Sequence, residues 1–280
     1  MDLHVLAAMM FAAFCHAAWN ASIKVRLDPA VATVLMSVAS GVVAMPLLLL
    51  FGLPAAESWP FLAASLVIHI GYWTALSEAY RFGDFGQVYP LARGAAPLFT
   101  ALGSMAILSE SLGPVGWAGI LTLVAGVLLL SLGKSSVGHI DRRAVALAFA
   151  TALTIVAYTL VDGIGARRSG SPHAYALAFF AGNGLVMLAF GLLRAPRRTV
   201  MGLKKDWTLA FVGGVLSLAS YWIALWAMTR APIGLVAAVR ETSVLFAAIL
   251  SITVLKEKAL ASRVVAAGLV MAGLILVRLH

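Results

Sequence analysis

Residues 234–246, GLVAAVRETSVLF, place two opposite charges, Arg240 and Glu241, side by side in a segment that is otherwise apolar or small. A charge inside a membrane helix costs about 2.5–3.5 kcal/mol on insertion scales, and such charges usually mark a functional site. The composition of the whole chain also suits a lipid bilayer. Its 280 residues are 62% hydrophobic and 11% charged, whereas soluble domains carry about 25% charged residues. We therefore expect a membrane protein with a charged site in its apolar interior.

Ten apolar runs have the length of about 20 residues that a membrane helix needs. Turn-forming pairs such as Asp28-Pro29 and Ser171-Pro172 separate some of them, and no loop is long enough for a soluble domain. A membrane β-barrel would need strands of about 10 residues with alternating polarity, and these runs do not alternate. We therefore expect an all-α fold, a polytopic membrane helical bundle of ten transmembrane helices. The runs cover residues 3–23, 30–52, 59–81, 87–109, 115–133, 143–164, 172–193, 207–229, 234–255 and 262–279.

The net charge of +9 comes from basic residues in the short segments between the runs, as is usual for charges that flank membrane helices. This placement argues against a nucleic-acid partner, which would need a basic surface on a soluble domain. The expected partners are the lipid bilayer and a small-molecule substrate. We expect no cofactor and no metal, because the histidines have no cysteine pair or acidic cluster beside them. Cys15 is the single cysteine, so an intrachain disulfide is impossible.

The chain repeats itself at a nearly constant offset. Residues 72–81, YWTALSEAYR, align with 221–230, YWIALWAMTR, and residues 91–110 align with 238–257. Shared Tyr-Trp, Arg and Glu residues are harder to obtain by chance than shared Leu or Ala. We interpret the pattern as a duplication of five helices, over residues 1–137 and 138–280. Because five is odd, the second copy enters from the opposite side of the membrane. Inverted repeats of this kind place a site near the midplane and allow alternating access.

Four segments form two pairs across these halves: HAAWNASIK (16–24) with ALTIVAYTLVDG (152–163), and VYPLARGAAPLF (88–99) with LVAAVRETSVLF (235–246). Trp19 and Tyr158 are in register in the first pair, and a glutamate follows each member of the second. Together with residues 109–130, these segments resemble the first, fourth and fifth helices of the EamA family of the drug/metabolite transporter superfamily. The resemblance implies a secondary carrier that works without ATP. It does not fix the substrate, because members of the family move amino acids, metabolites and drugs.

Arg93 and Arg240 lie about six residues, or about 9 Å, inside their helices. As repeat partners they are expected to face one cavity, where two guanidinium groups suit a carboxylate, phosphonate or phosphate. Alternatively, each arginine neutralises a nearby acid. Glu241 has Gly94 as its repeat partner, so it breaks the symmetry; it could bind a substrate amine, carry a coupling proton or form a salt bridge to Arg93. Asp162, near the end of its run, is expected to be solvated or locally paired.

Aromatic and polar side chains share helix faces at spacings of three and four residues. Such faces favour an aromatic-walled cavity with polar tips, as in small-ligand sites. The alternatives are the aromatic belt at the membrane interface and ordinary helix packing. Besides Arg93, Arg240 and Glu241, the candidate substrate-binding residues are His16, Trp19, Asn20, His69, Tyr72, Trp73, Tyr89, Tyr158, Tyr221, Trp222 and Trp226.

The favoured function is a secondary active transporter of a small polar metabolite with an anionic group, such as an amino-acid carboxylate or a phosphonate. Proton coupling is a further hypothesis, and a flippase of lipid-linked sugars, or a subunit of one, is the alternative. A passive channel is a third. We do not expect an enzyme, because no nucleophile–base pair and no metal set stand out. The expected location is the bacterial inner membrane, as a multi-pass protein.

Small residues recur every four positions in two of the predicted helices. The pattern comprises Ala118, Thr122 and Gly126 in one helix and Gly268 and Ala272 in the other. Small residues at this spacing let membrane helices approach closely. The pattern predicts either packing between the halves or a dimer seam, so both a monomer and a homodimer remain open.

The orientation of the chain can be predicted from its basic residues. Most of the 20 Lys and Arg residues lie in the loops that follow the first, third, fifth, seventh and ninth runs, and such loops usually face the cytoplasm. Both termini should then lie outside, whereas the family resemblance implies that both lie inside. We expect alkaline phosphatase fused to the C-terminus to be active and a fluorescent protein fused there to be dark. The reverse pattern would contradict the charge argument.

Overall fold

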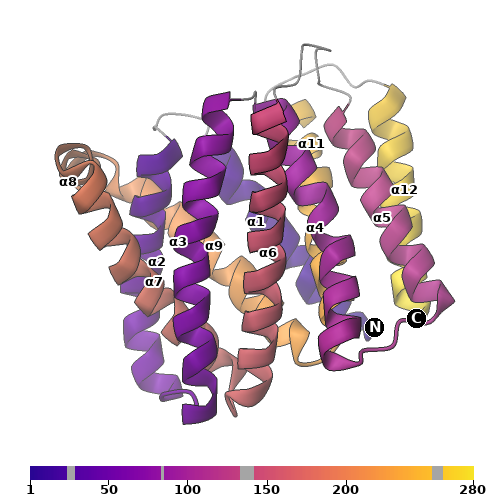
Figure 1. The fold of residues 1–280 in the computed structure, drawn as a ribbon, viewed down its shortest axis with the longest axis horizontal. Helices are drawn as coiled ribbons and strands as arrows, with labels where there is room; N and C mark the ends of the chain where they lie inside the picture. The colour runs from indigo at the N-terminus through magenta and orange to yellow at the C-terminus, as the bar shows by residue number, and fades with distance from the viewer. Residues whose placement is uncertain (24–28, 83–84, 133–141, 254–260) are drawn as a thin grey trace. The chain divides into compact units, whose positions relative to one another are not determined.

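The computed structural model describes residues 1–23, 29–82, 85–132, 142–253 and 261–280, and these form helices and short connections (Figure 1). The helices are α1 (Leu3–Ile23), α2 (Pro29–Phe51), the short 3₁₀ helix η1 (Ala56–Ser58), α3 (Trp59–Phe82), α4 (Phe85–Leu108), α5 (Pro114–Leu132), α6 (Arg142–Arg168), α7 (Pro172–Arg194), α8 (Pro196–Lys205), α9 (Trp207–Met228), α10 (Ile233–Arg240), α11 (Ser243–Thr253) and α12 (Ala261–Leu279).

The all-α prediction is confirmed for the described residues, and most helix boundaries lie within a few residues of the predicted runs. Within the described ranges, six helices are long and apolar enough to cross a membrane: residues 3–20, 31–51, 56–76, 142–168, 172–194 and 207–228. Shorter apolar helices cover 96–108, 114–130 and 264–279. The chain is thus an integral, multi-pass membrane protein, while the number of ten spans stays a prediction.

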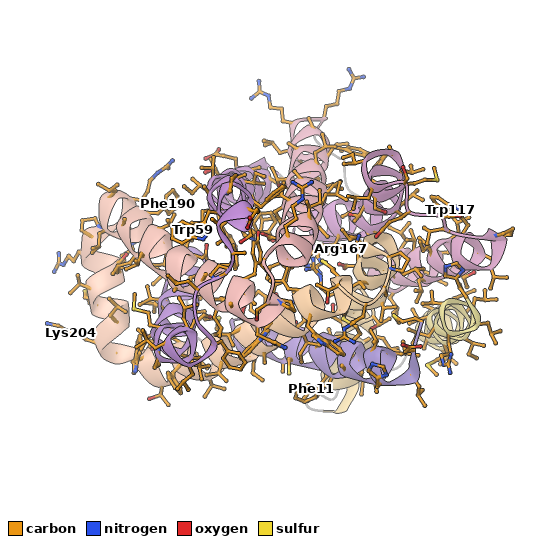
Figure 2. The ribbon with its side chains drawn as sticks, turned by 90° about the horizontal axis from the view of Figure 1, so that it is seen from below. Phe11, Trp59, Trp117, Arg167, Phe190 and Lys204 are labelled. Carbon is orange, nitrogen blue, oxygen red and sulfur yellow. The ribbon has the colours of Figure 1, made fainter. Side chains whose placement is uncertain are left out.

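Two features differ from the predicted runs. The run at 234–255 is interrupted, because α10 ends at Arg240 and α11 begins at Ser243. An additional helix, α8, occupies the predicted loop after α7. That helix has the sequence PRRTVMGLKK, with basic residues at both ends and the small Gly202 buried. It is therefore an amphipathic surface helix, and the Lys204 side chain points away from the neighbouring ribbon (Figure 2).

The described helices form two compact units, and each unit takes helices from both halves of the sequence. Unit 1 comprises residues 1–13, 68–160 and 230–280, and unit 2 comprises residues 14–67 and 161–229. The division falls within α1, α3 and α6. The compact units therefore differ from the two sequence repeats, as they must if the helices of duplicated halves pack against one another.

In unit 1, α5 and α12 pack side by side through glycine (Figure 1). A Cβ on Gly126 would lie 3.0 Å from Val270 N, and one on Gly273 would lie 2.8 Å from Leu123 N. The small-residue prediction was correct for Gly126. At Gly268 an added Cβ would have nothing within 4 Å among the described residues, so this position does not take part in the packing of α12 on α5, and a dimer seam there stays a prediction.

In unit 2, α2 and α7 cross where two glycines meet. A Cβ on Gly184 would lie 3.0 Å from Gly41 Cα, so the two backbones touch without intervening side chains. Around this crossing, Leu177, Phe180 and Leu218 form an apolar core. The helix α8 packs on α2, where a Cβ on Gly202 would meet Leu35. Close approach through small residues is the usual way in which membrane helices gain packing energy.

Candidate functional site

The charged stretch that interrupts the ninth predicted run forms a tight turn between α10 and α11. The N–H groups of Glu241 and Thr242 bond to the carbonyl oxygens three residues earlier, Ala238 O and Val239 O, at 3.2 and 3.0 Å. The Thr242 hydroxyl also donates to Val239 O at 2.7 Å. Bonds to the third preceding residue are of the 3₁₀ kind, and a short 3₁₀ stretch within a longer helix often marks a hinge. The corresponding α4 of the first half has no such interruption.

Glu241, on this turn, forms a buried ion pair with Arg93 of α4. Arg93 Nε donates to Glu241 Oε2 at 2.9 Å, and Arg93 Nη2 donates to Oε1 at 2.7 Å. Both side chains are about 95% buried. Two parallel bonds between a guanidinium and a carboxylate combine geometric specificity with charge-assisted strength. Of the roles considered for Glu241, the salt bridge to Arg93 is therefore the one that the structure contains.

Arg240 lies beside this pair in sequence and is 4% exposed. Its Nη2 donates a long hydrogen bond, 3.4 Å, to the hydroxyl of Tyr158 on α6. Neighbouring residues on a helix point about 100° apart, so Arg240 and Glu241 reach different partners. The side chains of Arg93, Glu241 and Arg240 together carry one net positive charge.

An aromatic cluster of unit 1 continues from Tyr158. The ring centroids of His69 and Tyr158 lie 4.3 Å apart, and those of Tyr72 and Tyr158 lie 5.8 Å apart. Tyr72 in turn contacts Trp73, at 4.8 Å. The structure therefore brings seven predicted residues into one unit: Arg93, Arg240, Glu241, His69, Tyr72, Trp73 and Tyr158.

Three further buried hydrogen-bonding atoms lie on the helices that carry the ion pair and the aromatic cluster. Trp73 Nε1, Thr100 Oγ1 and Thr159 Oγ1 are buried and make no hydrogen bond within the described part of the chain. Thr100 lies seven residues, or about two turns, after Arg93 and so shares its helix face. Sequence reasoning did not select the two threonines, because threonine is common in membrane helices and usually bonds to its own backbone.

The position of the ion pair depends on how α10 packs against α4. The two helices run antiparallel, since Gly234 meets Ala101 at one point and Glu241 meets Arg93 further along. A Cβ on Gly234 would lie only 2.6 Å from Ala101 Cα. Close contact between the two backbones is therefore possible only with glycine at position 234.

A glutamate just beyond α4 holds the first turn of α10. Ser109 has a positive φ of 54°, which turns the chain sharply after Leu108. Glu110 Oε2 then accepts a hydrogen bond from Ile233 N at 2.9 Å. A carboxylate at a helix N-terminus bonds to an N–H that the helix itself cannot satisfy and interacts favourably with the helix dipole. The repeat partner, Glu257, lies outside the described residues.

We expect Glu110→Ala to lower the free energy of unfolding by about 0.5–2 kcal/mol, the usual cost of losing a helix cap. Ile233 is fully buried, so its N–H would lose its acceptor in an apolar setting. Thermal unfolding in detergent measures the effect. Glu110→Gln keeps an acceptor oxygen and should retain more of the stability. Equal melting temperatures for Glu110→Ala and the parent would show that the bond contributes little.

The remaining predicted residues lie in unit 2, apart from Tyr89, whose side chain is outside the described residues. The rings of His16 and Trp19 make an edge contact at 5.1 Å, which agrees with their predicted shared face. Asn20 Nδ2 donates to His16 O at 2.9 Å, so this amide bonds to its own helix. Trp226 is partly buried on α9.

Two more predicted residues of α9 have specific polar partners. Trp222 Nε1 donates to His173 Nδ1 at 2.9 Å. The hydroxyl of Tyr221 donates to Asp162 Oδ2 at 2.6 Å. Asp162 was expected to be solvated or locally paired; it is fully buried, so the solvated alternative is wrong, and the carboxylate accepts bonds from tyrosines of other helices. The error arose because α6 continues to Arg168, which places Asp162 well inside the helix instead of near its end.

The long apolar helices place this chain in the class of polytopic helical membrane proteins. Within them it buries a bidentate ion pair beside a helix interruption. The sequence matches the EamA-like transporter family over residues 3–132 and again over residues 142–279. The chain belongs to this family, and the predicted membership is confirmed. The family comprises membrane transporters, and the double match agrees with two homologous halves.

The fold is also found among solved structures. One crystal structure has a TM-score of 0.81 at 17% sequence identity, and the alignment covers 100% of this chain and 98% of the other. At this identity the likeness concerns the fold alone. No protein with a curated description matches the sequence.

Proposed function

We propose that the protein is a secondary carrier of a small polar metabolite with an anionic group, and that Arg240 binds this group. The observation that carries the proposal is the position of Arg240, which lies buried at a helix interruption with the hydroxyl of Tyr158 at 3.4 Å. A buried positive charge is costly in a membrane protein and is usually retained for a function. A long hydrogen bond to a neutral hydroxyl is also easily exchanged for a stronger bond to an anion.

The division of roles between the two arginines follows from Glu241. Since Arg93 is engaged by this carboxylate through two short bonds, its charge is balanced, and we assign it to the architecture of the site. The guanidinium of Arg240 would then meet a carboxylate or phosphonate through two parallel hydrogen bonds, as guanidinium groups commonly do. Trp73 Nε1 and the hydroxyls of Thr100 and Thr159, which are buried and make no hydrogen bond within the described residues, would supply donors for the remaining polar groups of the substrate.

Alternating access would use the 3₁₀ turn at residues 241–242 as a hinge. The inverted repeat that the sequence indicates favours such a movement, and the turn lies next to Arg240. Binding of the anion would replace the hydrogen bond from Arg240 to the Tyr158 hydroxyl. The link between α10 and α6 that this bond provides would then be lost. We further propose the bacterial inner membrane as the location.

The proposal can be tested with the purified protein and a panel of four anionic or zwitterionic probes: L-alanine, aminomethylphosphonate, acetate and inorganic phosphate. We expect at least one probe to raise the melting temperature of the parent and to exchange in counterflow assays in liposomes. Arg240→Ala should lose both effects, and Arg142→Ala, which changes an exposed arginine of α6, should keep them. Equal stabilisation of Arg240→Ala and the parent would show that Arg240 is not the anion site.

Tyr158→Phe tests the neighbouring position. It removes the hydroxyl that accepts the bond from Arg240 but leaves the ring, which packs on His69. We expect weaker discrimination among the probes while exchange continues. Full loss of folded protein in this variant would instead assign the hydroxyl a purely structural role.

A further inference from the structure

Among the described acids of unit 2, Asp162 on α6 is the most deeply buried and has no exposed surface. Both of its oxygens accept a hydrogen bond from a tyrosine. Tyr175 of α7 donates to Oδ1 at 2.9 Å, and Tyr221 of α9 donates to Oδ2 at 2.6 Å. One carboxylate therefore joins three helices through two hydroxyl groups.

The local sequence is adapted to this arrangement. Gly165 lies three residues after Asp162, on the same face of α6, and a Cβ there would lie 2.5 Å from Tyr175 Cζ. Any larger residue would push the ring away from the carboxylate. Tyr175 is itself fully buried, so its hydroxyl has a fixed position. A glycine, a buried tyrosine and a second tyrosine from another helix together build a specific site around Asp162.

Other ionisable groups of α6, α7 and α9 have partners of their own. On α7 these are His173, whose Nδ1 accepts a bond from Trp222, and Arg194, which lies over Phe190. On α9, Tyr221 is the only ionisable side chain, and α2 has none. On α6, Arg167 donates to Met228 O at 2.8 Å, and Arg168 lies over the Phe61 ring. The same helix carries Tyr158, which accepts a bond from Arg240, and the exposed Arg142 and Arg143 at its start. The hydroxyls of Tyr175 and Tyr221 are thus two hydrogen-bond donors to this carboxylate, each from a different neighbouring helix.

Protonation would change what Asp162 can do. An ionised carboxylate only accepts hydrogen bonds, whereas a protonated carboxyl also donates one. A tyrosine hydroxyl that now accepts must turn its own hydrogen elsewhere. Hydrogen bonds to an ionised group are also roughly twice as strong as those between neutral groups. Binding one proton would therefore weaken the link between α6, α7 and α9.

We infer that Asp162 is the proton-binding residue of the carrier, and that its two tyrosines transmit the proton's presence to α7 and α9. The inference rests on the proposed function, because it supplies the driving ion for that transport. It differs from the expectation that Glu241 carries the coupling proton, since Glu241 is bonded to Arg93 through both of its oxygens.

Infrared difference spectra of the purified protein, recorded between neutral and acidic pH, test proton binding without any substrate. We expect a carboxyl C=O stretching band that is absent from Asp162→Asn and present in Glu57→Gln, which changes an exposed acid. Tyr221→Phe should keep the band but move it to higher frequency, because the carboxyl loses one hydrogen bond. A band that persists in Asp162→Asn, or that does not move in Tyr221→Phe, would overturn the assignment even if one variant folds poorly.

Proton coupling is tested in liposomes with the same four probes. We expect an imposed pH gradient to drive net uptake of the exchanged probe by the parent. Asp162→Asn should lose this net uptake while it retains counterflow. Gradient-driven uptake by Asp162→Asn, or uptake driven by sodium instead of protons, would contradict the inference. Absence of counterflow in the parent would contradict the proposed function instead, and the infrared result would remain informative by itself.

Discussion

Glu241→Gln should abolish transport and lower the free energy of unfolding by about 3–5 kcal/mol, the usual effect of removing one partner from a buried ion pair. The amide keeps the shape of the side chain but has no charge, so the guanidinium of Arg93 stays buried without compensation. The pair also holds the turn at residues 241–242 against α4. Its loss should therefore displace Arg240. Thermal unfolding and counterflow measure the two effects, with Glu57→Gln as an exposed control.

The double variant Arg93→Met with Glu241→Leu separates stability from function. Replacing a whole buried ion pair by apolar residues of similar volume is often neutral or stabilising. We therefore expect this variant to regain most of the parental melting temperature while transport stays absent, because the turn loses its specific partner. If it also regained transport, the pair would be a packing element only. If Glu241→Gln melted like the parent, the pair would contribute little to stability.

The buried ion pair between Arg93 and Glu241 could be predicted only in part from the sequence. The symmetric positions of Arg93 and Arg240, and the asymmetry of Glu241, were visible in the repeat. The distance between Arg93 and Glu241 was not, because 148 residues separate them and only the packing of α10 on α4 brings them together. A salt bridge was accordingly one of three roles that the sequence left open for Glu241.

The fold, too, could be predicted only in part from the sequence. Long apolar runs predicted the helices well, because the bilayer requires about 20 apolar residues per span. The interruption after Arg240 was not predicted, since apolar residues continue on both sides of Arg240 and Glu241 and neither proline nor glycine marks the turn. The helix α8 was also missed. Its 10 residues are too short and too basic for a span, and only their amphipathic pattern distinguishes them from a loop.

The sequence correctly predicted which aromatic residues share a helix face, but it did not predict their contacts with other helices. Spacing of three or four residues identified the contacts of His16 with Trp19 and of His69 with Tyr72. It could not show that Tyr221 bonds to Asp162, because that contact joins two helices. Tyr175 was not selected at all. The nearby Gly165, whose role depends on Tyr175, is indistinguishable in sequence from any other glycine of an apolar helix.

Gly234→Ala should disrupt the site through packing, although the residue itself contacts no charge. The added Cβ would lie 2.6 Å from Ala101 Cα and 2.7 Å from Ala101 Cβ. Both are rigid groups of α4, so one helix has to move. Overpacking of this kind costs about 1–3 kcal/mol. The movement also lengthens the distance between α10 and α4, which carry Glu241 and Arg93. We expect a lower melting temperature and at least a tenfold loss of counterflow, and a bulkier Gly234→Leu should prevent folding.

Gly268→Ala is the matched control, because it makes the same substitution in α12 where nothing lies within 4 Å of the new Cβ. Alanine is favoured over glycine within a helix by about 1 kcal/mol, so this variant should be as stable as the parent or slightly more stable, with normal transport. The contrast separates the steric effect at position 234 from the general effect of changing a helical glycine to alanine. If Gly234→Ala matched Gly268→Ala in melting temperature and transport, close contact between α10 and α4 would not be what positions the buried ion pair.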